Sequence, residues 1–561
     1  MKPKYTHIPQ FGSGEFPDFR QPGAWYVDKS LLIRDVLLGS QCLLLPRPRR
    51  FGKTLNMNML KCWFDITRKN QDELFAGLKI MQEEPKILAT RGAHPVIFLS
   101  LKDWKCGDID KLQQTLVGRM AQLLSPHRHD FVALDSVQQM ILERILEQQG
   151  TDDDLKQSLA LLMEALHLKH GKKVMILIDE YDAPVLHAIS EGFAKPAIAL
   201  LGPWLSSALK NNDHLEKAVL TGILCLAQQS IFSDLNHFTC YSVIDAGDFA
   251  DKFGFTEEET QQALIEFGRQ DQAEDVRGWY NGYNFNGIQI YNPWSLGEFL
   301  VRGNLAPHWL NTSSNQLIFT ELARAGEPLL QELEKLLQGE SIITQLSDRA
   351  TLRDLVDDTP RDILFSFFVL CGYLKAHDKF VDEGDLLESW HVSIPNREIE
   401  AVFAEFVRQV TSSRKGLPKL NSPLLQSFIA DDAPKFQREL NDFLKGVASY
   451  HDTAKTPEIF LHGLILGLLL PLRSHYRLES NIESGEGRAD LICRPKTPGF
   501  TAKLIEFKAV AKDADLDALA DAAIAQIDDN DYAARLREEG IHDFAKLSVV
   551  ISGKKCRVRK A

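Results

Sequence analysis

Up to about residue 240, short apolar runs alternate with longer amphipathic stretches, and this alternation limits the folds open to the chain. The runs include residues 42–45, 95–101, 174–178 and 218–221, each four to seven residues long. Buried parallel strands separated by helices have this pattern. We therefore predict that residues 1–240 form an α/β domain built on a parallel sheet.

Three further changes of pattern divide the rest of the chain. Residues 241–330 are rich in aromatic and turn residues, which predicts a compact connecting subdomain. Residues 331–450 are rich in Leu and Glu at helical spacing, so we expect a helical linker region. Residues 451–561 begin with an apolar helix and continue with short apolar strands. This last segment predicts a second, smaller α/β domain.

Composition excludes several classes of protein. The net charge is −13, from 64 basic and 77 acidic residues, so the chain is not a basic nucleic-acid coat. No apolar run approaches the roughly 18 residues that a membrane span needs, and no secretory signal is apparent. The eight cysteines are scattered without a Cys-x-x-Cys pair, which suggests neither a zinc site nor a disulfide framework. We expect a cytoplasmic protein that does not contact a membrane.

The first candidate site is the loop after the apolar run at 43–45. Gly52, Lys53 and Thr54 open the next amphipathic stretch, so backbone N–H groups at a helix start would face a phosphate. Lys53 would contact the β- and γ-phosphates, and the Thr54 hydroxyl would bind Mg²⁺. The full phosphate-loop pattern requires glycine at position 47, where this chain has arginine. The loop alone therefore leaves phosphate binding undecided.

A second feature favours nucleotide binding. The apolar run at 174–178 ends in Asp179 and Glu180. An aspartate at the end of a buried strand can hold Mg²⁺ through water, and the following glutamate can orient or deprotonate the attacking water. Solvated acids that cap a strand are the ordinary alternative. Because the loop precedes the acidic strand end within an α/β pattern, we predict that ATP and Mg²⁺ bind here.

The C-terminal domain contains a second constellation, made of Asp490, Glu506 and Lys508. Side chains alternate along a strand, so Glu506 and Lys508 share one face. The two acids would hold Mg²⁺ or Mn²⁺, which polarises a phosphodiester and lowers the pKa of a bound water. Lys508 would position that water or help to deprotonate it. A solvated salt bridge on an exposed strand is the alternative.

Two flanking residues extend this constellation. Glu458 opens the apolar helix expected at 459–470 and would complete the acidic cluster as a further metal ligand. Gln526 would lie on a helix beside the strand, with Tyr532 six residues later. The basic tail at 554–560 would contact a phosphate backbone or be a frayed terminus.

Several strings resemble one known family. They include RPRRFGKT at 47–54, IDEYDAP at 178–184, WYNGY at 279–283 and YNPWS at 291–295. In this order they resemble the AAA-ATPase-like family of bacterial proteins that carry a PD-(D/E)XK nuclease domain at the C-terminus. The resemblance implies a P-loop domain and a restriction-endonuclease-like α/β domain.

The resemblance also assigns roles to individual residues. It implies Walker A roles for Lys53 and Thr54 and Walker B roles for Asp179 and Glu180. The family shows an acid on the first helix of the nuclease domain, then G-x-G-R-x-D, E-x-K and a helical glutamine. The residues that match these features here are Glu458, Asp490, Glu506, Lys508 and Gln526.

One departure from the family bears on ATP hydrolysis. The family usually has a basic residue at the position of Cys225 and a lysine at that of Gln228, and both are neutral here. Positive groups near the γ-phosphate stabilise the transition state, and one arginine can contribute about 10³–10⁵ in rate. We expect ATP to be bound but hydrolysed slowly, with Arg47, Arg49 and Arg50 as the compensating charges.

The combined features predict a metal-dependent nuclease that hydrolyses DNA or RNA and is regulated by nucleotide. The resemblance also implies defence against foreign nucleic acid, such as that of viruses, and sites completed across subunits of a homo-oligomer. The alternative function is a nucleotide-sensing scaffold that binds nucleic acid or protein without hydrolysis. Neutral residues at Cys225 and Gln228 favour the scaffold, whereas the carboxylate–lysine set opposes it.

Overall fold

The structure is a computed structural model that divides the chain into two compact units, and each is described by itself. The first unit contains residues 1–317 and 343–399, and the second contains 318–342 and 400–561. The residues that the structure describes are 13–68, 72–225, 238–309, 332, 335–337, 339–347, 361–381, 387–403, 422–447, 468–469, 472, 475–484, 487–496, 499–510, 515–552 and 555–561.

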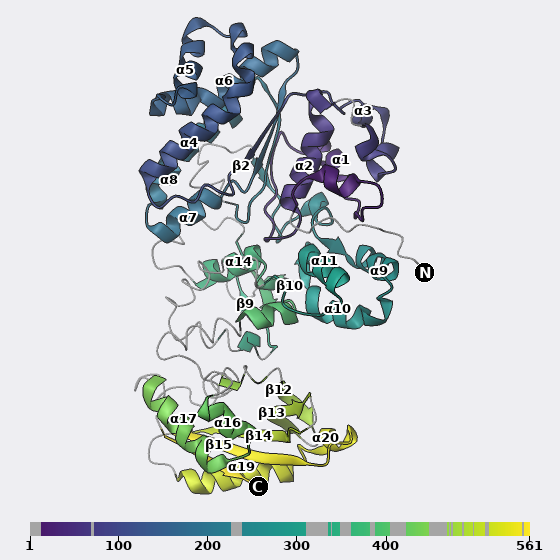
Figure 1. Ribbon diagram of the computed structural model, residues 1–561, viewed down its shortest axis with the longest axis vertical. Coiled ribbons are helices and arrows are strands. Elements are labelled where there is room, and N and C mark those ends of the chain that lie inside the picture. The colour runs from purple at the N-terminus through teal and green to yellow at the C-terminus, as the bar shows by residue number, and fades with distance from the viewer. Residues whose placement is uncertain are drawn as a thin grey trace. The chain divides into compact units, whose positions relative to one another are not determined.

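A five-stranded parallel sheet forms the centre of the first unit, as the apolar runs predicted (Figure 1). The strands, in spatial order, are β2 (Val96–Ser100), β3 (Val174–Asp179), β4 (Leu215–Leu220), β1 (Cys42–Leu44) and β5 (Phe238–Cys240). All six residues of β3 are buried, which explains its continuous apolar run. Because β4 lies between β1 and β3, the loop after β4 lies between the two predicted parts of the nucleotide site.

Helices cover both faces of this sheet. The helix that follows β1, α2 (Lys53–Phe64), packs on one face, and α6 (Asp152–His170) and α8 (Ala194–Leu209) pack on the other (Figure 1). Thr151 caps α6 through a reciprocal capping box. The other α-helices described in this part of the chain are α1 (Leu32–Leu38), α3 (Pro85–Leu88), α4 (Ile109–Leu124), α5 (Ser136–Leu146) and α7 (Ala183–Glu191).

The aromatic segment forms a small subdomain within the same unit. Its sheet has the order β6 (Phe255–Thr256), β8 (Ile288–Tyr291) and β7 (Tyr283–Phe285). Tyr280 and Tyr291 are buried in its core rather than displayed as a stacking surface. Its helices are α9 (Glu257–Glu266), α10 (Ala273–Tyr280) and α11 (Pro293–Arg302).

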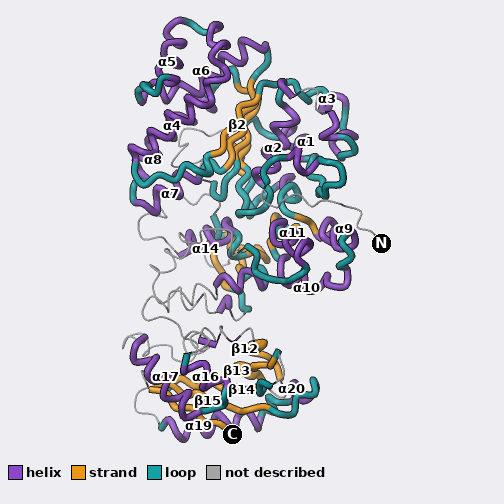
Figure 2. Tube along the Cα trace, viewed as in Figure 1, coloured by secondary structure: helices purple, strands orange, loops and turns teal. Residues whose placement is uncertain are grey.

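The segment expected to be a helical linker contains strands as well as helices. Figure 2 shows strands beside α14 (Arg361–Cys371). The strands β10 (Lys375–Val381), β11 (Glu388–Ser393) and β9 (Ile342–Thr344) form a sheet in that order. In β10 and β11, polar residues occupy much of the surface, so the apolar period that would reveal a strand is weak.

The C-terminal unit contains a mixed five-stranded sheet. Its order is β12 (Tyr476–Ser484), β13 (Gly487–Pro495), β14 (Ala502–Ala509), β15 (Phe544–Ser552) and β16 (Lys555–Lys560). Only β14 and β15 run parallel, and α19 (Leu516–Asp529) connects them and packs against both. The other face of the sheet packs against α16 (Pro423–Ile429) and α17 (Ala433–Val447), and α20 (Ala534–Glu538) follows α19. The expected second α/β domain is confirmed.

The basic tail is part of this sheet. As strand β16 it pairs with β15 from Lys555 to Lys560, and Arg557 and Arg559 form ion pairs with Asp517 of α19. The described part of the tail is therefore an ordered edge strand and not a frayed terminus. No helix in the described parts of the chain is long and apolar enough to cross a membrane.

Candidate active sites

The loop between β1 and α2 has a backbone shape that suits an anion. Gly52, which immediately precedes α2, has φ +83°, and Arg50 has φ +70°. Left-handed residues next to right-handed ones turn successive N–H groups toward a common concavity, which is typical of phosphate-binding loops. For a non-glycine residue such as Arg50, this conformation is costly and clusters at functional sites.

Lys53 and Thr54 take the first two positions of α2, and both contact the rest of the site. The Lys53 ammonium group is buried and donates to the carbonyl oxygens of Arg47 and Pro48, at 3.0 Å each. Burial lowers its pKa, so an anionic ligand would compensate for lost hydration. The Thr54 hydroxyl donates to Asp179 Oδ2 at 2.7 Å.

Asp179 connects three elements at one end of the sheet. Its second oxygen, Oδ1, accepts a hydrogen bond from the Thr221 hydroxyl at 2.8 Å, and the residue is fully buried. The ends of β3 and β4 and the start of α2 are thus joined through one carboxylate. A hydroxyl beside a carboxylate is an oxygen donor set that Mg²⁺ accepts.

Glu180 follows Asp179 with φ +51°, which turns the chain sharply at the end of β3. Burial lowers the pKa of both Arg50 and Lys53, and the charge of Glu180 partly opposes the shift in each. The charge of Glu180 therefore acts on two cations at the phosphate loop (residues 45–52) and the helix start that follows it, and its role in orienting water stays a prediction.

Asp182 and Tyr181 also belong to this site, although the sequence analysis gave them no role. Asp182 Oδ2 accepts the N–H groups of Ile223 and Leu224 at 2.7 and 2.9 Å, and the Tyr181 hydroxyl donates to the Leu224 carbonyl at 2.7 Å. Burial raises the pKa of Asp182. A Cβ on Gly222 would lie 2.6 Å from Asp182 Oδ1, so the loop after β4 requires glycine there. The third acid of the IDEYDAP string was the available signal.

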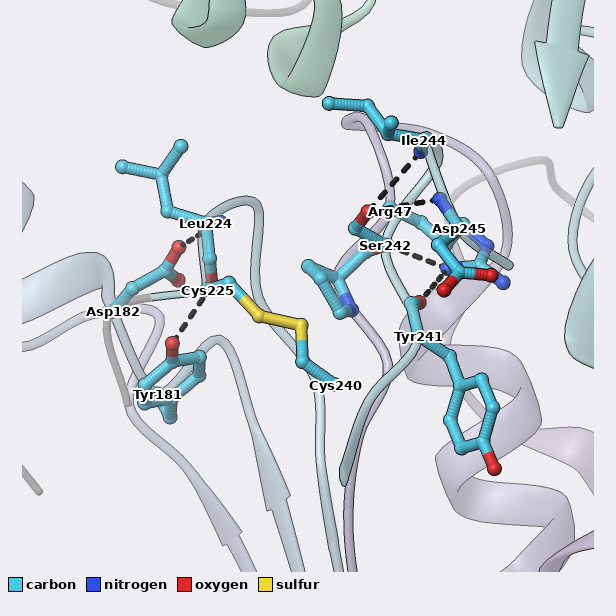
Figure 3. The surroundings of a disulfide bond; sticks show 11 residues. Arg47, Tyr181, Asp182, Leu224, Cys225, Cys240, Tyr241, Ser242, Ile244 and Asp245 are labelled. Carbon is cyan, nitrogen blue, oxygen red and sulfur yellow. Dashed lines mark hydrogen bonds between the residues drawn. A yellow bond between two sulfur atoms is a disulfide. The ribbon is translucent and has the colours of Figure 1, made fainter. Parts of the chain in front are cut away.

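A disulfide joins Cys225, which follows this loop, to Cys240 at the end of β5 (Figure 3). Their Cα atoms are 6.6 Å apart. We expected no disulfide framework, and this pair departs from that expectation: β4 and β5 flank β1, and the segments that carry the two cysteines follow or end these strands. Gln228 lies outside the described residues.

Arg47 does not belong to the compensating charges that we expected near the phosphates. Its guanidinium is fully buried and donates to the carbonyl oxygens of Pro46, Tyr241 and Phe249. It also lies over the rings of Phe253 and Phe285. Burial lowers its pKa to about 9. Arg47 thus holds the loop in place through its buried contacts. Arg49 and Arg50 are half-buried on the same loop.

In the C-terminal sheet, Asp490 and Glu506 lie opposite each other on neighbouring strands. The antiparallel register pairs Leu491 with Ile505, so Asp490, one residue before Leu491, faces Glu506, one residue after Ile505. Asp490 Oδ2 accepts the N–H of Phe507 at 2.8 Å. The Lys508 ammonium group lies 3.0 Å from Glu506 Oε1, two residues along the same face. The structure thus brings the three predicted residues together.

Glu506 is the most electrostatically perturbed member of this group. Its side chain is 2% exposed, and its Oε2 has no hydrogen-bond partner among the described residues. Desolvation, followed by the charge of Asp490, raises its pKa to about 7, and Lys508 opposes this shift. Two facing carboxyls with an unsatisfied oxygen need a proton or a cation between them.

The donor set fits a divalent cation in part. Within the described ranges, no three His, Cys, Asp or Glu side chains are grouped closely enough to hold a metal. Asp490 and Glu506 supply two carboxylates, and Glu458, the third predicted ligand, lies outside the described residues. The metal site therefore remains a prediction that two neighbouring carboxylates support.

Gln526 lies on α19, on the face of the sheet that carries Glu506. The carbonyl of Ala520 in α19 accepts a hydrogen bond from Ser548, which is the β15 register partner of Glu506. Gln526 is six residues further along this helix, or about 9 Å. Its amide donates to the Tyr532 hydroxyl at 3.2 Å. Its catalytic role stays a prediction.

Comparison with known proteins assigns both regions. Residues 10–232 match the family model described as "Predicted AAA-ATPase", and residues 456–561 match the PD-(D/E)XK nuclease superfamily. These matches confirm the resemblance inferred from the motifs. The chain is also 24% identical over 535 residues to an uncharacterized protein in the vnfD 5' region of Azotobacter chroococcum mcd 1, covering 92% of this chain and 91% of that protein. No solved structure matches the chain.

Proposed function

We propose that this chain, which contains an AAA-ATPase-like domain and a C-terminal PD-(D/E)XK nuclease domain, is a metal-dependent nuclease regulated by ATP. The two domains imply hydrolase activity. The observation that carries the proposal is the arrangement of Asp490, Glu506 and Lys508, in which a buried carboxylate oxygen lacks a partner among the described residues.

The roles follow from these contacts. Asp490 and Glu506 would bind Mg²⁺ or Mn²⁺, which supplies a Lewis acid for the phosphodiester and lowers the pKa of a bound water. The Phe507 N–H holds Asp490 in place. Lys508, about one-third exposed, orients Glu506 and would offset charge on the scissile phosphate. The substrate is nucleic acid, either DNA or RNA.

The N-terminal domain would bind MgATP. Lys53, Arg49 and Arg50 would contact the phosphates, Thr54 and Asp179 would hold Mg²⁺, and Glu180 would orient the attacking water. Slow hydrolysis is supported by the position of Cys225, which forms a disulfide and carries no charge. We also propose a cytoplasmic homo-oligomer with a role in defence against foreign nucleic acid; in a reducing cytoplasm Cys225 would be a thiol, which is neutral as well.

Cleavage assays test the nuclease proposal. Wild type, Glu506→Gln and Lys508→Met are incubated with DNA or RNA, Mg²⁺ or Mn²⁺, and with or without ATP. Wild type should cut and both variants should not. Asp528→Asn is a matched control, because Asp528 is a half-exposed acid of the same domain that pairs with Lys546. Variants that cut as well as wild type would show that the assigned centre is wrong.

The alternative is a nucleotide-sensing scaffold without hydrolytic activity, which the neutral Cys225 favours for the N-terminal domain. Calorimetry with Mg²⁺ or Mn²⁺ separates the two functions. A nuclease should bind the metal and lose binding in Asp490→Asn. Absence of metal binding by wild type, together with nucleic-acid binding but no cleavage, would support the scaffold.

A further inference from the structure

Arg50 of the phosphate loop is held by a side chain from the aromatic subdomain. Its guanidinium carbon lies 4.2 Å from the ring centroid of Trp294, in the first turn of α11. At this distance the positive charge is attracted to the face of the indole ring. Arg50 also has a left-handed backbone, three residues before Lys53. Its side-chain direction is therefore set by the backbone conformation of the loop and by the contact with Trp294.

Trp294 itself is fixed by a buried network. Asn292 Oδ1 accepts the N–H groups of Trp294 and Ser295 at 2.9 and 3.3 Å, which caps α11. The Ser295 hydroxyl donates to Glu398 at 2.8 Å, and Glu398 also accepts the Trp309 N–H at 2.8 Å. The indole is thus attached to a helix end that cannot shift without breaking buried hydrogen bonds.

The same subdomain holds the next residue of the loop. The Phe51 ring packs against Tyr283 and Phe285, with centroids 4.9 and 5.6 Å apart. The Phe51 carbonyl accepts the Gly254 N–H at 3.3 Å. Because Phe51 and Arg50 are both held from the same side, the subdomain determines how the phosphate loop is presented.

A further contact comes from the end of α14. Gly372 has φ +84°, and a Cβ there would lie 2.9 Å from Pro48 Cβ. Glycine at this position lets the chain after α14 approach the loop closely. The phosphate loop is therefore enclosed by residues that follow the parallel sheet in the sequence.

Of the three arginines on the phosphate loop, Arg49 and Arg50 remain to stabilise a transferred phosphoryl group. Arg47 is buried behind the loop, and Cys225 is in a disulfide. The charge of Glu180, the residue expected to orient water, acts on Arg50.

During hydrolysis, the water oxygen bonds to the γ-phosphorus as the bond to the ADP oxygen breaks. ADP leaves with the electron pair, and the water proton passes to Glu180, while negative charge on the phosphoryl oxygens must be stabilised.

We propose that Arg50 supplies this charge from within the same chain and that Trp294 is the positioning residue that holds Arg50 at the terminal phosphate. The inference rests on the proposed binding of MgATP to the phosphate loop. It makes the aromatic subdomain a part of the nucleotide site.

The test compares ground-state and transition-state binding. Wild type, Arg50→Ala, Trp294→Leu and Trp294→Phe are titrated with a non-hydrolysable ATP analogue and with ADP plus aluminium fluoride, and kcat and KM for ATP are measured. Trp294→Leu should bind the ATP analogue within about threefold of wild type, and Arg50→Ala should lose less affinity for this analogue than for the fluoride complex. Both should lose at least about tenfold in kcat and in affinity for the fluoride complex. Trp294→Phe, which keeps an aromatic face, should restore most of the loss.

A matched control is Arg91→Ala. Arg91 lies 5.9 Å from the Trp63 ring near the opposite end of α2, so its loss should leave kcat unchanged. Nucleotide binding should also change the tryptophan fluorescence of wild type, and this change should be smaller in Trp294→Phe.

Several outcomes would overturn the inference. If Trp294→Leu matches wild type in kcat and in binding the fluoride complex, Trp294 only packs. Should Trp294→Leu fail to fold, Arg50→Ala decides the question: if it matches wild type in kcat and in binding the fluoride complex, the inference is overturned. If wild type binds no nucleotide at all, the proposed function of the N-terminal domain fails, and the inference fails with it.

Discussion

Asp179 and Glu506 are both buried carboxylates on central strands, but their surroundings differ. Asp179 Oδ2 accepts a hydrogen bond from the Thr54 hydroxyl, and Oδ1 accepts one from the Thr221 hydroxyl. Glu506 is bonded through one oxygen to Lys508, and its other oxygen has no hydrogen-bond partner among the described residues. Asp490 lies opposite it and adds a like charge.

The two sites therefore differ in their state before a ligand binds. The nucleotide site is held together by its own hydrogen bonds, so its geometry exists before a metal or phosphate binds. The C-terminal site retains an uncompensated negative charge, which costs stability until a proton or cation arrives. Loss of charge should therefore have opposite effects on stability at the two carboxylates.

The largest expected effect is that of Glu506→Gln, which keeps the shape and removes the charge. Cleavage should fall by about 10³-fold or more, because the metal loses a carboxylate ligand. Without metal at pH 8, the free energy of unfolding should rise by about 1 kcal/mol, because the cost of burying the charge and the repulsion from Asp490 both disappear. Cleavage rates and urea unfolding measure the two effects. A variant that is less stable than wild type would contradict the comparison.

Reduction of the Cys225–Cys240 disulfide should have the next largest effect. The two cysteines are 15 residues apart in the sequence, and closing a loop of this length contributes about 3 kcal/mol. Dithiothreitol should lower the urea midpoint of wild type by a corresponding amount. The double variant Cys225→Ser, Cys240→Ser should be equally destabilised and insensitive to dithiothreitol. If reduced and oxidised wild type unfold at the same urea concentration, the bond does not stabilise the domain.

Glu398 tests whether burial alone accounts for the behaviour of Glu506. Desolvation raises its pKa from 4.5 to about 7, although Trp309 and Ser295 donate hydrogen bonds to it. Since the folded pKa is the higher one, its contribution to stability is complete below pH 4.5 and is lost as pH rises through 7. The free energy of unfolding should fall by up to about 3 kcal/mol across this interval.

Glu398→Gln should flatten this pH dependence. The pKa of Glu506 is raised in the same direction, so the comparison is made in the Glu506→Gln background. Urea unfolding from pH 4.5 to 8 provides the measurement. A slope that persists in the double variant would show that other groups dominate.

The smallest effect is expected for Asp179→Asn. The amide can accept only one of the two hydroxyl hydrogen bonds, so the free energy of unfolding should fall by about 1–2 kcal/mol. The sign is opposite to that expected for Glu506→Gln. Urea unfolding without nucleotide at pH 8 is the measurement, and a stabilised Asp179→Asn would remove the distinction between the two sites.

Local patterns predicted much of both sites. The apolar run of β3 placed Asp179 and Glu180 at a strand end, and alternation along β14 placed Glu506 and Lys508 on one face. These predictions rest on geometry that repeats every one or two residues, so they need no knowledge of the rest of the fold. The polar strands β10 and β11 lacked such a signal and were missed.

The partners of the side chains could not be predicted in the same way. Arg47 was expected near the phosphates, yet it contacts carbonyl oxygens almost 200 residues later. The Cys225–Cys240 bond depends on β4 and β5 flanking β1. The contact of Arg50 with Trp294 joins residues more than 240 positions apart.

Which residues can carry the chemistry, and which strand or helix start presents them, could be read from the amino-acid sequence, because these properties depend on residue type and local spacing. Which of these groups are held in place, neutralised or left with excess charge became known from the folded structure alone. Burial, hydrogen bonding and nearby charge are set by segments that are distant in the chain and meet only when the sheets assemble.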